Sequence, residues 1–117
     1  MEPRDTERGS SDNGDDDDSL VVDLITDEAG VGLVRIVGEL DLSNVNRVRA
    51  ITTQALERGA TRIVFDLAGI DFIDSSGVTV LLETVHQTDS VTIRQPSRSA
   101  LRVIETTGLA SILRIEP

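Results

Sequence analysis

The patterned part of the chain opens with two β-type runs. Leu20–Ile25 and Gly32–Val37 are rich in Val, Ile and Leu, and Thr26–Val31 between them holds the Asp and Gly residues typical of a reversing loop. We expect these runs to pair as an antiparallel hairpin. The apolar positions that follow recur at helical spacing and predict a helix that ends at Gly59. These positions are Val45, Val48, Ile51, Ala55 and Leu56.

A second unit of strand, loop and helix occupies the middle of the chain. Arg62–Leu67 is short and rich in β-branched residues, so it predicts a strand covered on both faces. Asp71–Leu82 then runs from the end of this buried strand through a loop, two serines and a glycine into a helix. We expect that helix to end near Gln87–Ser90. Backbone N–H groups point outward at such a helix N-terminus.

The last third of the chain repeats this alternation. Val91–Ile93 predicts a short strand, Pro96 and Ser97 open a third helix that Gly108 closes, and Ser111–Ile115 predicts a final strand. Strands that alternate with helices after an initial hairpin indicate an α/β fold with a mixed, mostly parallel sheet covered by helices. We expect residues 20–117 to form this single domain.

Composition supports one small soluble domain. The chain has 117 residues, of which 38% are hydrophobic, and its aromatic residues are Phe65 and Phe72, so the core must be built from Val, Ile, Leu and Ala. No run approaches the ~20 apolar residues that span a bilayer, and the N-terminus has no hydrophobic signal segment. We therefore expect a cytoplasmic protein without a membrane partner.

The negative charge is concentrated at the N-terminus. The formal net charge is −10, and residues 1–19 contribute eight acids and two arginines, a net of −6. Because this segment has almost nothing apolar to bury, we expect a disordered acidic tail. A nucleic-acid partner is not expected, because binding phosphates requires a concentrated basic surface.

The sequence does not favour an enzyme. The single histidine, His86, lies well along the second predicted helix, so Ser75 has no base with which to act as a nucleophile. The glycine spacing matches no phosphate-binding loop, and the chain has no lysine. Asp71 and Asp74 are too few and too isolated to indicate a metal site, and we expect no cofactor.

Two tetrapeptides in a fixed order carry a family resemblance. Gly38–Asp41, then Asp74–Gly77, then Pro96 opening a helix and Gly108–Leu109 before the last strand together resemble the anti-sigma factor antagonists of the STAS fold. The resemblance covers Leu20–Glu116. Its most specific element is Asp-Ser-Ser-Gly between a buried strand and an apolar helix.

The resemblance implies a phosphorylation switch. In such proteins the first serine of Asp-Ser-Ser-Gly, here Ser75, is phosphorylated by an anti-sigma factor that is also a serine kinase. The unphosphorylated antagonist binds that partner and releases its sigma factor, phosphorylation ends the binding, and a phosphatase restores it. The partner holds ATP, so the antagonist needs no cofactor. The residues expected to bind the partner are Glu39, Asp41, Asp74, Ser75, Ser76 and Gly77.

Two other interpretations stay open. Ser75 or Ser76 can simply cap the helix, which serine does well. The domain can also be a STAS scaffold or adaptor, in a signalling complex or on a transporter, without a phosphorylation switch. A phosphate on Ser75 would add about −1.5 to −2 charges beside Asp74, and the helix N-terminus would stabilise it locally.

Overall fold

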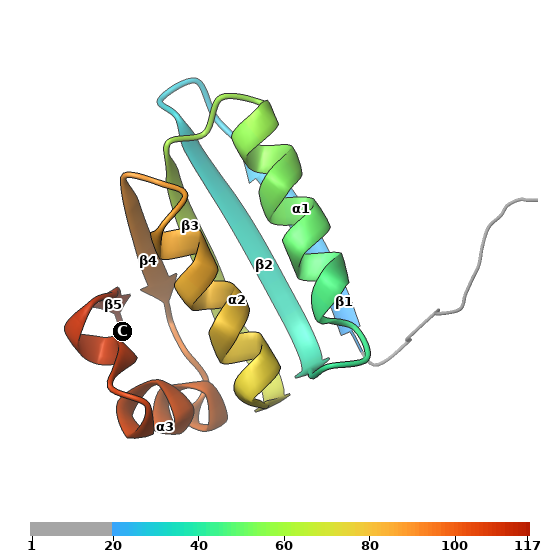
Figure 1. Ribbon diagram of the computed structural model, residues 1–117, viewed down its shortest axis with the longest axis vertical. Coiled ribbons are helices and arrows are strands. Elements are labelled where there is room, and N and C mark those ends of the chain that lie inside the picture. Colours follow the sequence, from blue (N-terminus) through green and yellow to red (C-terminus); the bar gives the residue numbers. More distant parts are fainter. Residues whose placement is uncertain (1–19) are drawn as a thin grey trace, which may run out of the picture.

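Five strands form one mixed sheet in the order β1-β2-β3-β4-β5 (Figure 1). The computed structural model describes residues 20–117, so the predicted acidic tail lies outside the described residues. β1 and β2 are antiparallel, and every other neighbouring pair is parallel, which confirms the predicted sheet and its hairpin. The strands are β1 (Leu20–Thr26), β2 (Val31–Leu40), β3 (Arg62–Ile73), β4 (Ser90–Arg94) and β5 (Arg114–Glu116).

The helices all lie on one face of the sheet. They are α1 (Val45–Glu57), α2 (Ser75–Val85) and α3 (Arg98–Thr106), with a short 3-10 helix, η1 (Leu109–Ser111), before β5. Each parallel connection steps to the next strand in the same direction, and right-handed crossovers then place their helices on the same side. Figure 1 shows α1 and α2 across the front of the sheet, with α3 at its lower end. The predicted helices are confirmed, although α2 ends at Val85, before the predicted end near Gln87–Ser90.

The core lies between these helices and the sheet. Aliphatic side chains from both layers fill it around Phe65, which is fully buried, whereas Phe72 is 50% exposed at the end of β3. Burying such side chains is the main favourable term in folding a domain of this size. The largest fully buried side chains besides Phe65 include Ile36, Leu40, Ile63, Leu67, Leu81, Ile93 and Ile104.

β3 differs from its prediction in two respects. It continues past Leu67 to Ile73 because β2 still pairs with it there, and two register shifts, each with one extra residue in β3, accommodate the irregular stretch. The expectation of cover on both faces is wrong for residues 20–117: Val64 and Asp66 alternate with buried residues and remain partly exposed. The helices cover only one face, so the side chains of the other face meet solvent.

The C-terminal strand begins later than predicted. Gly108 adopts a left-handed backbone, φ 79°, and leads into η1 rather than into a strand. The Leu113 amide donates to the Leu109 carbonyl at 3.0 Å, so this segment has a helical turn that buries both leucines. β5 therefore starts at Arg114, and the prediction of a strand over 111–115 is wrong in its first part.

Candidate functional site

The carboxylate of Asp74 caps helix α2. Its Oδ1 accepts hydrogen bonds from the Ser76 amide at 2.8 Å and from the Gly77 amide at 3.3 Å. An N-cap side chain that accepts from the second and third helical residues satisfies amides that the helix cannot pair itself. The interpretation that Ser75 or Ser76 caps the helix is therefore wrong, because Asp74 holds that position.

The same carboxylate joins α2 to the loop between β2 and α1. Its second oxygen, Oδ2, accepts from the Leu42 amide at 3.3 Å, and the Asp74 amide donates to the Leu40 carbonyl at 3.1 Å. β2 and β3 are parallel neighbours, so their carboxyl ends meet at one edge of the sheet. This pairing brings together the two tetrapeptides that the sequence singled out.

The β2–α1 loop is fixed by its own polar side chains. Asn44 is buried; its Nδ2 donates to the Glu39 carbonyl at 2.8 Å, and its Oδ1 accepts from the Asp41 amide at 3.0 Å. The Asp41 carboxylate accepts from the Ser43 amide at 3.0 Å and from the Ser43 hydroxyl at 2.6 Å. Asp41 therefore orders the loop from within, and the two hydrogen bonds of Asn44 within the loop were not predicted.

Ser75 presents an accessible hydroxyl beside this loop. It is the first residue of α2 and is exposed, and its hydroxyl makes no hydrogen bond within residues 20–117. Its carbonyl accepts from the Thr79 hydroxyl at 2.9 Å, which keeps the backbone in the helix. Ser76 is partly buried by comparison. Of the two serines, Ser75 is the one more open to a reagent from outside.

Gly77 lies beneath the surface of the site. It is buried, and a Cβ at this position would come within 2.7 Å of Ile73 Cγ1 and 2.9 Å of Leu40 Cδ2. Contacts that short force neighbouring side chains to move. Glycine thus lets the first turn of α2 sit directly on the ends of β2 and β3, which positions Ser75.

Glu39 is not brought to the same surface. It is exposed on β2 between Gly38 and the buried Leu40, whose side chain faces α2. Since side chains alternate along a strand, Glu39 points to the opposite face of the sheet. The structure thus groups Asp41, Asp74, Ser75, Ser76 and Gly77 at one edge and leaves Glu39 apart from them.

The charged side chains in the segments around Ser75 are acidic, which disfavours a further negative charge on this serine. The two segments 41–44 and 74–77 contain Asp41 and Asp74 and no basic side chain. The amides of Ser76 and Gly77 already donate to Asp74. The expected stabilisation of a Ser75 phosphate by the helix N-terminus therefore does not include these two amides. A phosphate would add its charge next to that of Asp74.

An ion pair joins α1 and α2 away from the serines. Arg49 Nε lies 2.9 Å from Glu83 Oε1, and a second contact from the same guanidinium reaches Oε2 at 3.3 Å. The hydrogen bond from Arg49 lowers the pKa of Glu83, and the same bond raises the pKa of Arg49. This two-point contact joins α1 and α2 at a partly exposed position.

Three exposed apolar side chains were not predicted, and Leu42 is the one that lies beside the serines. Leu42 is 74% exposed at the tip of the β2–α1 loop, Phe72 is 50% exposed at the end of β3, and Leu82 is 37% exposed on α2. In the sequence, the position of Leu42 between the polar residues Asp41 and Ser43 was the sign that this leucine would be exposed. Exposed apolar side chains beside an accessible serine suit a protein-binding surface.

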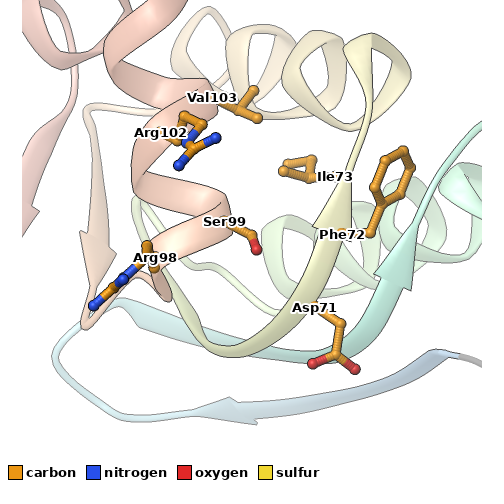
Figure 2. A pocket seen from close by; sticks show the side chains of 7 residues that line it. All are labelled: Asp71, Phe72, Ile73, Arg98, Ser99, Arg102 and Val103. Atoms are coloured by element: carbon orange, nitrogen blue, oxygen red, sulfur yellow. The ribbon is translucent and has the colours of Figure 1, made fainter.

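A cavity of about 410 Å³ opens between the end of β3 and α3 (Figure 2). Ile73, which precedes Asp74, and Val103 on α3 form part of its apolar wall, and Arg102 stands at its side. The sequence did not predict it, because its walls lie far apart along the chain. Its lining residues are Asp71, Phe72, Ile73, Arg98, Ser99, Arg102 and Val103.

Residues 20–117 contain no group of three or more His, Asp or Glu side chains placed to hold a metal ion. In the same range, none of the helices has the length and apolar character needed to cross a membrane.

Comparison with known proteins identifies relatives of this fold. The family model for the STAS domain matches residues 24–117. An anti-sigma F factor antagonist from Lysinibacillus sphaericus is 33% identical over 93 residues, which are 75% of this chain and 78% of that protein.

Solved structures of anti-sigma factor antagonists have a fold similar to that of this chain. The anti-sigma factor antagonist SpoIIAA in its unphosphorylated form is 25% identical, with a TM-score of 0.71 over 83% of this chain and 89% of that one. SpoIIAA from Bacillus in the phosphorylated form has a TM-score of 0.65 at 25% identity, covering 83% of this chain and 92% of that one. An anti-sigma factor antagonist from Mycobacterium paratuberculosis, 22% identical, shares the fold with a TM-score of 0.76 over 86% and 87% of the two chains.

Proposed function

Because this chain belongs to the STAS domain family, we propose that it is an anti-sigma factor antagonist whose binding is switched off by phosphorylation of Ser75. In the unphosphorylated state it would bind an anti-sigma factor that is also a serine kinase and make it release its sigma factor. A phosphatase would remove the phosphate. The partner would hold ATP, so this chain would need no cofactor for the switch.

The relatives support the proposal. The Lysinibacillus sphaericus protein is named as an anti-sigma F factor antagonist and shares 33% of aligned residues with this chain. SpoIIAA has been solved both unphosphorylated and phosphorylated, with a fold similar to this one in each case. A domain of this kind can thus carry a phosphate and keep its fold.

The observation that carries the proposal is the division of roles between Asp74 and Ser75. Asp74 accepts both amides of the first turn and the Leu42 amide, so the helix does not need the serine hydroxyl. Ser75 next to it is exposed and its hydroxyl is unbonded within residues 20–117. A serine that the fold does not use as a cap is free to accept a phosphoryl group.

The effect of the phosphate would be electrostatic. It would add about −1.5 to −2 charges at pH 7, next to a carboxylate whose amide partners are already engaged. An interface that has closed over Leu42 and Ser75 would have to desolvate that charge, which typically costs several kcal/mol when it has no partner. The unmodified surface, with its exposed leucine, carries no such cost.

The test uses purified protein and candidate serine-kinase anti-sigma factors from the same genome. We expect ATP-dependent addition of one phosphate, mapped to Ser75 by peptide mass spectrometry, and none on Ser75→Ala. Ser75→Ala should still bind the kinase, because it removes one oxygen and keeps the shape of the surface. Ser75→Asp should keep the fold but bind at least tenfold more weakly, which corresponds to about 1.4 kcal/mol.

Two controls separate the switch from general charge effects. Ser76→Ala should still be phosphorylated at Ser75, and Ser90→Asp, at the start of β4 and hence at the other edge of the sheet, should bind as the wild type does. If Ser76→Ala abolished the modification and Ser75→Ala did not, the wrong serine would have been chosen. If no cognate kinase modified either serine and Ser75→Asp bound normally, a scaffold or adaptor role would replace the antagonist role.

A further inference from the structure

The face of the sheet opposite the helices carries a ladder of alternating charges. The strand registers place Asp23 opposite Arg35, Arg35 opposite Asp66, Asp66 opposite Arg94 and Arg94 opposite Glu116. These five side chains form one row across all five strands, with the signs acid, base, acid, base, acid. The row reads the same from either end.

Most of this row is not neutralised within the domain. Arg94 and Glu116 form an ion pair at 3.7 Å, and Asp66 accepts from the Ala68 amide at 3.1 Å. Asp23 and Arg35 form no ion pair within residues 20–117 and are exposed. Adjacent opposite charges stabilise the strands modestly, and the exposed groups remain available to an outside surface.

Apolar rows flank the ladder on both sides. On one side Ile25 pairs with Leu33 and Leu33 with Val64; on the other, Val21 pairs with Val37. Ile25 is 63% exposed and Val21 50% exposed, while the other three are partly buried. A hollow of about 200 Å³ lies along the first of these rows, lined by Ile25, Leu33 and Val64 among others. The open face therefore has apolar side chains on both sides of the charged row.

We propose that this open face binds a second copy of the same chain, sheet against sheet, about a twofold axis parallel to the strands between β2 and β3. That rotation brings each residue of β2 over β3 of the other copy, and each residue of β1 over β4. Arg35 then meets the partner's Asp66 and Asp23 meets the partner's Arg94, each pair occurring twice. Every contact in the row joins opposite signs.

The same axis also matches the apolar rows. Leu33 lies over Val64 of the other copy, and Val37 lies over Gly69, where the neighbouring Val37 of that copy fills the space beside the glycine. Sheets packed in this manner keep their strands roughly aligned, which the proposed axis requires. The apolar contacts would supply most of the affinity, and the charges would set the register, because exposed ion pairs are individually weak.

This inference does not depend on the antagonist role. The helices and Ser75 lie on the other side of the sheet or at its edge, so a dimer of this kind leaves both copies of the serine accessible (Figure 1). The partner implied is a second copy rather than a different protein, because the row of alternating charges is complementary to the same row of another copy.

The test measures molecular mass by light scattering or sedimentation of the full chain over a range of concentrations. We expect a concentration-dependent dimer that is weakened at least tenfold by Arg35→Glu and likewise by Asp66→Arg. Each substitution opposes like charges twice across the axis. Mixing the two variants should restore the dimer, because Glu at position 35 of one chain then meets Arg at position 66 of the other. Arg58→Glu makes the same charge change on the helix side and should have no effect.

The mixing experiment also separates an interface effect from misfolding, since an unfolded variant cannot be rescued by its counterpart. A monomeric wild type at every concentration would overturn the proposal, and so would a dimer that neither variant weakens. If deleting residues 1–19 turned a monomeric full chain into a dimer, that segment would be the occupant of the face in place of a second copy.

Discussion

Replacing Asp74 should have two separable effects, because its two carboxylate oxygens serve different parts of the structure. Oδ1 accepts from the amides of Ser76 and Gly77, and Oδ2 accepts from the Leu42 amide of the neighbouring loop. Asp74→Ala removes all three hydrogen bonds. Asp74→Asn can keep the first two, since Asn caps helices about as well as Asp, but its NH₂ group cannot accept from Leu42.

The expected losses follow from these contacts. Loss of an N-cap side chain costs about 1 kcal/mol, and loss of the hydrogen bond between the loops costs about 1 kcal/mol more. A loss of 1 kcal/mol lowers the melting temperature of a domain of this size by about 4–8 °C. We therefore expect Asp74→Ala to melt roughly 10 °C below the wild type, and Asp74→Asn to lose about half as much.

Thermal unfolding followed by circular dichroism measures the size of both effects, and hydrogen exchange locates them. In Asp74→Asn the Leu42 amide should exchange faster while the Ser76 amide stays protected, whereas in Asp74→Ala both should exchange faster. If Asp74→Ala melted within roughly two degrees of the wild type, or if Asp74→Asn lost as much stability as Asp74→Ala, the two carboxylate oxygens would not have these separate roles.

Three smaller changes test other parts of the domain. Gly77→Ala should lower stability by about 1 kcal/mol or more in a thermal melt, because its Cβ would crowd Ile73; a gain would show that the site has room. The pKa of Glu83 is lowered by the hydrogen bond from Arg49, so that pair contributes stability above the ordinary carboxyl pKa and loses it as the pH falls through the lowered one. Urea unfolding across pH should therefore show a shallower acid loss for Glu83→Gln, and an unchanged slope would argue against the pair. Thr52→Val should raise stability by about 1 kcal/mol by urea unfolding, because the buried Thr52 hydroxyl has no hydrogen-bond partner among the described residues; a loss would mean that the hydroxyl is bonded.

Much of the fold could be predicted because local patterns set it. The hairpin follows from two β-type runs around a loop with Asp and Gly, and the end of α1 follows from Gly59, whose φ is 97°. The extension of β3 could not be predicted in the same manner. Ala68, Gly69 and Asp71 have low strand propensity, and pairing with β2 keeps this stretch extended.

At the site, too, some features follow from the local sequence, whereas others depend on contacts between residues far apart in the chain. Asp74, Ser75 and Ser76 are all good N-cap residues, so composition alone did not say which one caps the helix; the backbone position of the first turn decides it. The contact between Leu42 and Asp74 joins residues 32 positions apart and depends on β2 and β3 being neighbours. The open face was missed because a continuous apolar strand was expected to be covered on both sides.

The strand order also has a consequence for how the domain folds. Each strand pairs only with the strand before it and the strand after it in the chain, from β1 to β5. No strand must wait for a distant segment to be inserted beside it, so the sheet can grow from the hairpin one unit at a time. Chains with mostly local pairings close smaller loops and tend to fold faster than chains with long-range pairings. We expect refolding of this domain to be fast for a sheet protein, with each helix docking as its strand is added.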